Sequence, residues 1–290
     1  MAYIIAVVSE GDGTGKTTIC HFLGGALANS GHQVLLVDYT WKFDLSALMT
    51  ADDAACRTNA KCMITEQMIK QCAGKIHQSR YKRLFWILGS PELDHAWNLL
   101  SSGGLGMAEI RNRTFGQLDH SFQFVLIDCP SGFVFHTQLS LAIADFALVP
   151  TKFGPSGIQN LRKMMKSIRN HQERINRRLG DPWVVLNCDR SGFRNPSKFE
   201  MKARDEFYDN MLITTVPWRK VYRRPARTND KGKLILDDRR PADPTTSMDN
   251  LAGEISESIR RKAMHGPKRA IAVVPSVSHL EESYRLEPFL

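Results

Sequence analysis

The sequence has no hydrophobic run near the length that a membrane-spanning helix needs, which is about 20 residues. Its first residues lack the basic segment and the cleavage site of a secretory signal peptide, so we expect a cytoplasmic protein. Six cysteines are scattered without a CxxC pair, which argues against a zinc site or a disulfide framework and favours reduced, buried thiols. Because 42% of the 290 residues are hydrophobic, the chain can bury a core.

Charge is distributed unevenly along the chain. Residues 1–150 hold 11 basic and 13 acidic residues, whereas residues 151–290 hold 28 and 17, so the whole excess of +9 lies in the second half. This asymmetry indicates a polyanionic partner such as nucleic acid or an acidic membrane surface. Solvated helix faces rich in Arg and Lys are the alternative explanation.

Short β-branched apolar runs alternate with helical patterns along most of the sequence. Buried strands are expected at Tyr3–Val8, Val34–Asp38, Leu84–Leu88, Phe124–Asp128, Phe146–Pro150, Trp183–Asn187 and Leu212–Val216. Helical patterns lie between them, most clearly at Gly157–Leu179. The alternation predicts an α/β fold with a doubly wound, mostly parallel sheet flanked by helices.

A single domain is expected over residues 1–265, followed by a C-terminal tail at 266–290. Residues 217–247 contain four prolines and many Arg and Lys residues with little periodicity, which is typical of a long functional loop. A helix is predicted to follow at about Met248–Met264.

A glycine-rich turn separates the first predicted strand from an amphipathic helix. Its residues are Gly11, Asp12, Gly13, Thr14, Gly15, Lys16, Thr17 and Thr18. Consecutive backbone N–H groups in such a turn, together with the helix N-terminus, form a cradle for phosphate. We therefore predict a nucleotide site in which Lys16 reaches the β- and γ-phosphates and the Thr17 hydroxyl ligates Mg²⁺.

Two aspartates close predicted strands at the edge where open α/β sheets bind their ligands. Asp128 ends an apolar strand and can hold Mg²⁺ through water, and Asp38 ends the second strand, where it can meet metal or water. Ser131 and Gly132 follow Asp128 and can bring a backbone N–H close to a γ-phosphate. A helix N-cap or a turn residue is the structural alternative for each aspartate.

These motifs together resemble the ParA/MinD family of deviant Walker A P-loop ATPases. Gly11–Thr17 is similar to the family's KGGxGK[ST] motif, Val34–Asp38 to its second motif, and Leu126–Pro130 to its DxP Walker B motif. Later strands match in order, so the resemblance covers roughly residues 3–262 and is greater to the ParA side than to MinD.

The resemblance implies a nucleotide switch that binds ATP and Mg²⁺. In that family ATP drives a sandwich dimer, the dimer binds DNA nonspecifically, and a partner protein of the ParB type stimulates hydrolysis. By resemblance, Asn187 contacts the adenine and Pro217 borders its pocket. Ordinary loop chemistry is the alternative for both residues.

Two positions depart from the family pattern. The signature lysine that reaches across the dimer falls at position 11, which is Gly11, and the water-positioning aspartate falls at Thr40. One added cation in phosphoryl transfer can be worth about 10³–10⁵ in rate, so we expect slow or absent hydrolysis. Candidates to replace the cation are Lys42 and Lys152, and candidates to replace the acid are Asp12 and Asp44.

The basic second half is interpreted as a surface for DNA of any sequence. The candidate contacts in its loop are Arg219, Lys220, Arg223, Arg224 and Arg227. Phosphate contact requires only cations within reach, whereas a membrane role requires a basic helix with a bulky apolar face, which we do not find.

We therefore expect an ATP-binding switch with weak ATPase activity that serves plasmid or chromosome partition as a dimer on the nucleoid. One alternative is a nucleotide-binding, non-hydrolysing adaptor in conjugation-type DNA transfer or cell positioning, which Gly11 and Thr40 favour. A small-molecule kinase or synthetase on the same fold is a further alternative, but no acid/base set for a substrate is evident.

Overall fold

The computed structural model describes residues 2–40, 42, 44–49, 76–79, 81–87, 121–152, 154–187, 196–217 and 244–265. Its strands are β1 (Tyr3–Ser9), β2 (Val34–Asp38), β3 (His77–Gln78), β4 (Leu84–Ile87), β5 (Phe124–Ser131), β6 (Phe146–Lys152), β7 (Trp183–Asn187) and β8 (Met211–Val216). Its α-helices are α1 (Lys16–Asn29), α2 (Asp44–Met49), α6 (Phe135–Ile143), α7 (Pro155–Arg174), α8 (Pro196–Glu206) and α9 (Pro244–His265), with a short 3₁₀ helix, η4, at Tyr208–Asn210.

The eight strands form one sheet in the order β3-β4-β2-β5-β1-β6-β7-β8. All neighbouring pairs are parallel except β3 and β4, which pair antiparallel at one edge. Because β1 lies between β5 and β6 while β2 lies on the far side of β5, the carboxyl ends of β1, β2 and β5 meet at one end of the sheet. The predicted doubly wound, mostly parallel sheet is confirmed.

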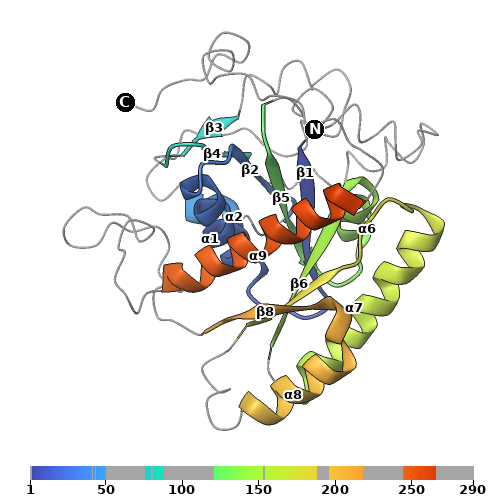
Figure 1. The fold of residues 1–290 in the computed structure, drawn as a ribbon. Coiled ribbons are helices and arrows are strands. Elements are labelled where there is room, and N and C mark those ends of the chain that lie inside the picture. Colours follow the sequence, from blue (N-terminus) through green and yellow to red (C-terminus); the bar gives the residue numbers. More distant parts are fainter. Residues whose placement is uncertain are drawn as a thin grey trace.

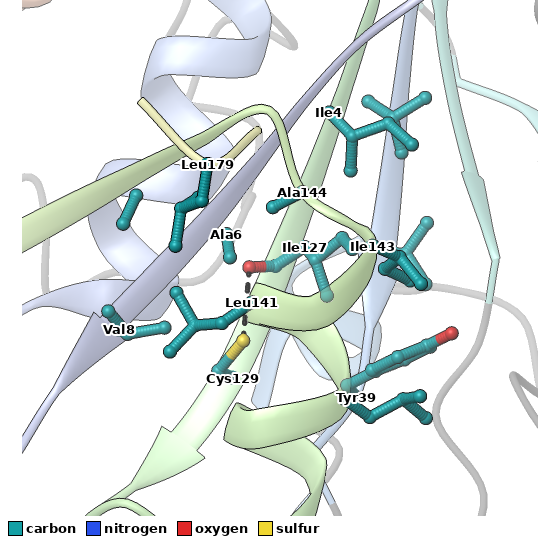
Figure 2. Packing of buried hydrophobic residues seen from close by; sticks show 14 of the residues in the cluster. Ile4, Ala6, Val8, Tyr39, Ile127, Cys129, Leu141, Ile143, Ala144 and Leu179 are labelled. Atoms are coloured by element: carbon teal, nitrogen blue, oxygen red, sulfur yellow. Dashed lines mark hydrogen bonds between the residues drawn. The ribbon is translucent and has the colours of Figure 1, made fainter. Parts of the chain in front are cut away.

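Each face of the sheet has its own hydrophobic core, because successive side chains of a strand point to opposite faces. In β1, Ile4, Ala6 and Val8 pack with residues of α6 and α7, whereas Ile5 and Val7 pack with α1 and α9. Figure 1 shows α1 and α9 on one face and α6 and α7 on the other. Figure 2 shows the core on the α6 and α7 side of the sheet. There the Cys129 thiol donates a hydrogen bond to the Ile127 carbonyl oxygen at 3.6 Å.

The predicted helix and strand boundaries need corrections. The helix predicted at Gly157–Leu179 runs from Pro155 to Arg174, because a proline is favoured in the first turn of a helix. It ends early because Asn176, just beyond it, donates hydrogen bonds to the carbonyl oxygens of Leu141 and Ala144.

The last predicted helix begins at Pro244, so residues 244–247 are helical and not part of the loop. Four strands are longer than predicted, since β1 continues to Ser9, β5 continues to Ser131, β6 continues to Lys152 and β8 begins at Met211. The remaining loop, residues 218–243, and the predicted tail, 266–290, lie outside the described residues.

Strand β8 forms an edge of the sheet and is irregular. Between its pairings with Val184 and Leu186 of β7, β8 has extra residues, so part of its backbone is not paired with β7. The Glu254 carboxylate of α9 accepts hydrogen bonds from the backbone N–H groups of Ile213 (2.5 Å) and Thr214 (3.0 Å). On the same segment, the Arg204 guanidinium of α8 donates to the carbonyl oxygens of Leu212 (2.9 Å) and Ile213 (3.1 Å).

Candidate functional site

The glycine-rich loop connects the end of β1 to the start of α1. Two of its residues have a left-handed backbone, Gly13 with φ +63° and Gly15 with φ +92°, which explains why glycine occupies these positions. The loop borders a cavity of about 430 Å³ that is also lined by Lys42 and Asp44 of the β2–α2 segment and by residues 129–131 of β5. The structure thus brings together the loop and the ends of β2 and β5, as the sequence predicts.

Lys16, the first residue of α1, is buried and folds back over the loop. Its ammonium donates hydrogen bonds to the Ser131 hydroxyl (2.7 Å), the Ser9 hydroxyl (3.1 Å) and the Gly11 carbonyl oxygen (3.4 Å). Burial lowers the pKa of Lys16, and the nearby Asp128 opposes part of that effect. The side chain is therefore held by neutral oxygen atoms, which a phosphate group can replace.

Asp38 and Asp128 are register partners on β2 and β5, and both are fully buried. Asp38 accepts four hydrogen bonds: one oxygen takes the backbone N–H and hydroxyl of Thr40 (2.9 and 2.5 Å), and the other takes those of Ser46 (2.9 and 2.7 Å). Burial raises the pKa of Asp38, and the bonds from Thr40 and Ser46 oppose that rise. Asp38 therefore holds the segment between β2 and α2 in place. This contact fits the alternative interpretation of Asp38 as a turn residue.

Asp128 differs from its neighbour because neither of its carboxylate oxygens accepts a hydrogen bond from the described part of the chain. Burial raises the pKa of Asp128 well above its usual value, and the charge of Asp38 adds to that rise. The Thr17 side chain and the Lys16 ammonium act in the opposite direction. An unsatisfied buried carboxylate beside a threonine hydroxyl is suited to Mg²⁺, which prefers oxygen ligands and usually retains several waters.

Asn187, at the end of β7, lies against the glycine-rich loop. Its side-chain amide donates a hydrogen bond to the Thr14 carbonyl oxygen at 2.8 Å, and a Cβ atom added to Gly15 would lie only 2.1 Å from that amide nitrogen. Pro217 follows Val216, which is the register partner of Asn187 on β8. The predicted adenine contacts of Asn187 and Pro217 remain predictions, whereas the contact of Asn187 with the loop is a feature that the sequence did not indicate.

Gly11 and Thr40, the two positions that depart from the family pattern, both lie against other side chains of the site. A Cβ atom added to Gly11 would lie 2.7 Å from the Asn160 amide nitrogen of α7, and the Thr40 hydroxyl is bonded to Asp38. Lys152, the register partner of Asn187, lies beside the loop, since a Cβ atom on Gly13 would be 3.1 Å from its ammonium nitrogen. Both candidate replacements for the missing cation, Lys42 and Lys152, thus lie next to the loop.

Further contacts of Ser9 and Ser131 at this site had no signal in the sequence. The Ser9 hydroxyl lies 2.7 Å from the Thr14 hydroxyl and accepts from Lys16. The Ser131 hydroxyl links Lys16 to the Asp12 carboxylate, to which it donates at 2.5 Å. Ser131 and Gly132 are predicted to bring a backbone N–H close to a γ-phosphate, which stays a prediction. In the structure the Gly132 N–H donates to the Ser9 carbonyl oxygen at 2.9 Å, and the Ser131 hydroxyl contacts Lys16.

The loop residues predicted to contact DNA lie outside the described part of the chain. These residues are Arg219, Lys220, Arg223, Arg224 and Arg227. Within the described ranges, no helix combines the length and the apolar character that crossing a bilayer requires.

Comparison with known proteins places this geometry in a family. Residues 2–180 match the AAA_31 family model, which is described as an AAA domain. The sporulation initiation inhibitor protein Soj of Bacillus subtilis is 22% identical over 250 residues, which are 82% of this chain and 93% of Soj. The maintenance of carboxysome distribution protein A of Synechococcus elongatus is 26% identical over 171 residues, or 58% of this chain and 66% of that protein.

A solved structure also shares the fold. The septum site-determining protein MinD from Pyrococcus horikoshii, solved in complex with Mg-ADP, superposes with a TM-score of 0.65 at 22% identity, over 91% of this chain and 99% of that one. The fold and the glycine-rich loop define a P-loop nucleotide-binding protein with a mostly parallel sheet. The chain belongs to the AAA_31 family and is a P-loop ATPase of the ParA/MinD type.

Proposed function

We propose that this protein is an ATP-dependent switch that binds Mg-ATP at the glycine-rich loop, forms a dimer in that state and holds DNA through its basic half. The observation that best supports the nucleotide site is the buried Lys16 ammonium, held over the loop by hydroxyl and carbonyl oxygens. The Mg-ADP complex of the MinD structure, which shares the fold, is consistent with this assignment.

The residues of this site have different roles. Backbone N–H groups at the start of α1 bind phosphate oxygens, and Lys16 exchanges its contacts with Ser9 and Ser131 for the β- and γ-phosphates. Thr17 and Asp128 would hold Mg²⁺, which would neutralise charge on the phosphate oxygens. Asp38 keeps the β2–α2 segment in place beside the cavity through Thr40 and Ser46.

Hydrolysis is expected to be slow, because the two groups that usually promote it are missing. Gly11 has no side chain, and the Thr40 hydroxyl is committed to Asp38. Lys42 or Lys152 supplies the remaining positive charge near the loop. An ATP-bound state that persists is suited to a protein that stays on DNA until a ParB-like partner protein acts on it.

The described part of the basic half supports a surface for nonspecific DNA. Exposed cations on α7 and just after it make no ion pair with any described residue; they are Lys163, Lys166, Arg169, Arg174, Arg177 and Arg178. Only one acidic residue, Glu173, lies on the exposed face of this helix. Unpaired exposed cations of this kind bind phosphates without regard to base sequence.

The nucleotide assignment is tested with the variant Lys16→Ala. Loss of several charge-assisted hydrogen bonds to phosphate should weaken ATP binding at least about 100-fold and abolish ATP-dependent dimerisation. Isothermal titration calorimetry measures the affinity, and sedimentation with ATP, ADP or no nucleotide measures the dimer. Lys198→Ala is the matched control, since Lys198 is an exposed lysine of α8. If Lys16→Ala bound ATP like the wild type, the site assignment would be wrong.

A second candidate is a non-hydrolysing adaptor in DNA transfer or cell positioning, which uses bound ATP only to hold its shape. The bonded Thr40 hydroxyl and the missing side chain at Gly11 favour it. A single-turnover hydrolysis assay with and without DNA separates the two candidates, because the switch releases phosphate slowly and the adaptor releases none.

A further inference from the structure

The glycine-rich loop carries an acidic residue at the mouth of the phosphate site. The Asp12 carboxylate accepts a hydrogen bond from the Ser131 hydroxyl at 2.5 Å, and Ser131 in turn accepts one from the Lys16 ammonium at 2.7 Å. The Lys42 ammonium lies 4.0 Å from the same carboxylate oxygen. These contacts lower the pKa of Asp12, the Ser131 bond most strongly and Lys42 next, so the group is negatively charged at neutral pH.

The fold does not explain why this residue is acidic. Asp12 is not among the loop residues with a left-handed backbone, so its conformation is open to most residue types. Its side chain is 78% exposed, and an exposed ion pair such as the one with Lys42 contributes little to stability. Asp12 also lines both the 430 Å³ cavity and a second cavity of about 140 Å³ between the loop and α7. The carboxylate therefore faces the ligand site from its outer side.

The position of Asp12 determines which phosphate it meets. In P-loop proteins the loop N–H groups hold the α- and β-phosphates and the loop lysine reaches the β- and γ-phosphates. Because Lys16 donates to Ser131, a terminal phosphate bound by Lys16 would lie next to the hydroxyl that Asp12 contacts. The groups that Asp12 contacts are the Ser131 hydroxyl and the Lys42 ammonium. The Asp12 carboxylate therefore lies at a hydroxyl and an ammonium group that are both suited to a phosphate oxygen.

We propose that Asp12 is a specificity-determining residue that competes with the terminal phosphate of a nucleoside triphosphate for Ser131 and Lys42. The inference rests on the proposed nucleotide site. A triphosphate must displace the carboxylate and then lie beside its negative charge, whereas a diphosphate does neither. Asp12 thereby weakens the binding of ATP more than that of ADP. It lowers the ratio of the affinity for ATP to the affinity for ADP.

The test uses the full-length chain and the isosteric variant Asp12→Asn. The asparagine keeps a carbonyl oxygen for the Ser131 hydroxyl but removes the charge, so the comparison isolates electrostatic repulsion. We expect the affinity for Mg-ATP to rise about 10-fold, because one unit charge a few ångströms away is removed from a partly solvated site. The affinity for Mg-ADP should change by less than about 3-fold.

The matched control is Asp205→Asn, which removes the same charge from an exposed position on α8. It should leave both affinities unchanged, and Lys16→Ala is measured in parallel. If Asp12→Asn leaves the affinity for ATP unchanged or lowers it while Lys16→Ala abolishes binding, the role of Asp12 is refuted and the nucleotide site stands. An equal gain for ATP and ADP also refutes it.

If Lys16→Ala still binds ATP, the proposed function itself fails, and the inference fails with it. Asp12→Ser serves as a second variant if the asparagine protein does not fold, because serine also removes the charge, and the same criteria apply to it.

Discussion

The phosphate-site end of the sheet and the outer face of α7 hold their charges in opposite ways. At the sheet end, Lys16, Asp38 and Asp128 are buried side by side, and two of the three are surrounded by specific hydrogen bonds. On α7, the cations point into solvent, and the only one with an acidic partner in the described part is Arg162, bound to Glu206 at 2.5 and 2.7 Å.

This difference separates two kinds of function. A buried charge must have defined partners because its desolvation is costly, so each substitution at the sheet end changes both stability and ligand binding. An exposed charge is screened and contributes little to folding. We therefore expect the binding of a polyanion by α7 to depend only on the number and sign of its cations. The same chemical change, Asp→Asn, at the neighbouring positions 38 and 128 and the removal of cations from α7 test this separation.

The largest effect is expected for Asp38→Asn. Its amide group cannot accept the four hydrogen bonds from Thr40 and Ser46, and buried donors are then left without acceptors. The free energy of unfolding should fall by about 2–4 kcal/mol, measured by urea denaturation of the nucleotide-free protein. A change below about 0.5 kcal/mol would show that these bonds do not stabilise the β2–α2 segment.

The adjacent substitution Asp128→Asn should act in the opposite direction. It replaces a buried carboxylate that lacks hydrogen-bond partners in the described part of the chain, so the nucleotide-free protein should gain about 1–2 kcal/mol in unfolding free energy. The same variant should lose the Mg²⁺ dependence of ATP binding, measured by titration with and without EDTA. A destabilised variant would mean that Asp128 has a partner among the remaining residues.

The smallest effect on stability is expected on α7. Replacing Lys163, Lys166 and Arg169 together by alanine should change the free energy of unfolding by less than about 0.5 kcal/mol. Binding to DNA of any sequence should weaken, and the slope of log affinity against log salt should fall by up to about one unit for each cation. Fluorescence anisotropy over a salt series measures both quantities.

The control for α7 is Arg162→Ala, which removes a cation that Glu206 already neutralises. It should weaken DNA binding less, per cation removed, than the triple variant does. If the triple variant binds DNA as the wild type does, the DNA surface excludes α7 and is restricted to the other basic segments.

The parts of the fold that depend on local pattern could be predicted from the sequence. Continuous apolar runs predicted the strands from Tyr3 and Val34, and the glycine-rich loop predicted where Lys16 and Thr17 would lie. The mostly parallel pairing of the strands followed from the alternation of strands and helices, whereas their order in the sheet came only from the structure. Strand and helix ends were less accurate, because they depend on contacts such as those of Asn176 with Leu141 and Ala144.

Contacts between residues far apart in the sequence could not be predicted. The bond from Ser131 to Asp12 spans 119 positions, and the bond from Asn187 to Thr14 spans 173. Asp38 and Asp128 look alike as strand-ending carboxylates, and only the packed structure shows that one is fully hydrogen-bonded and the other is not. Their roles depend on what the β2–α2 segment places around them.

The side-chain bonds on β8 bear on how the molecule can associate. An exposed edge strand offers a template for another chain, and Ile213 on this edge is 83% exposed. Since Glu254 and Arg204 already occupy backbone N–H and carbonyl groups at Ile213, a second chain cannot extend the sheet through them without breaking these bonds. This edge of the sheet is thereby protected against uncontrolled strand-to-strand aggregation.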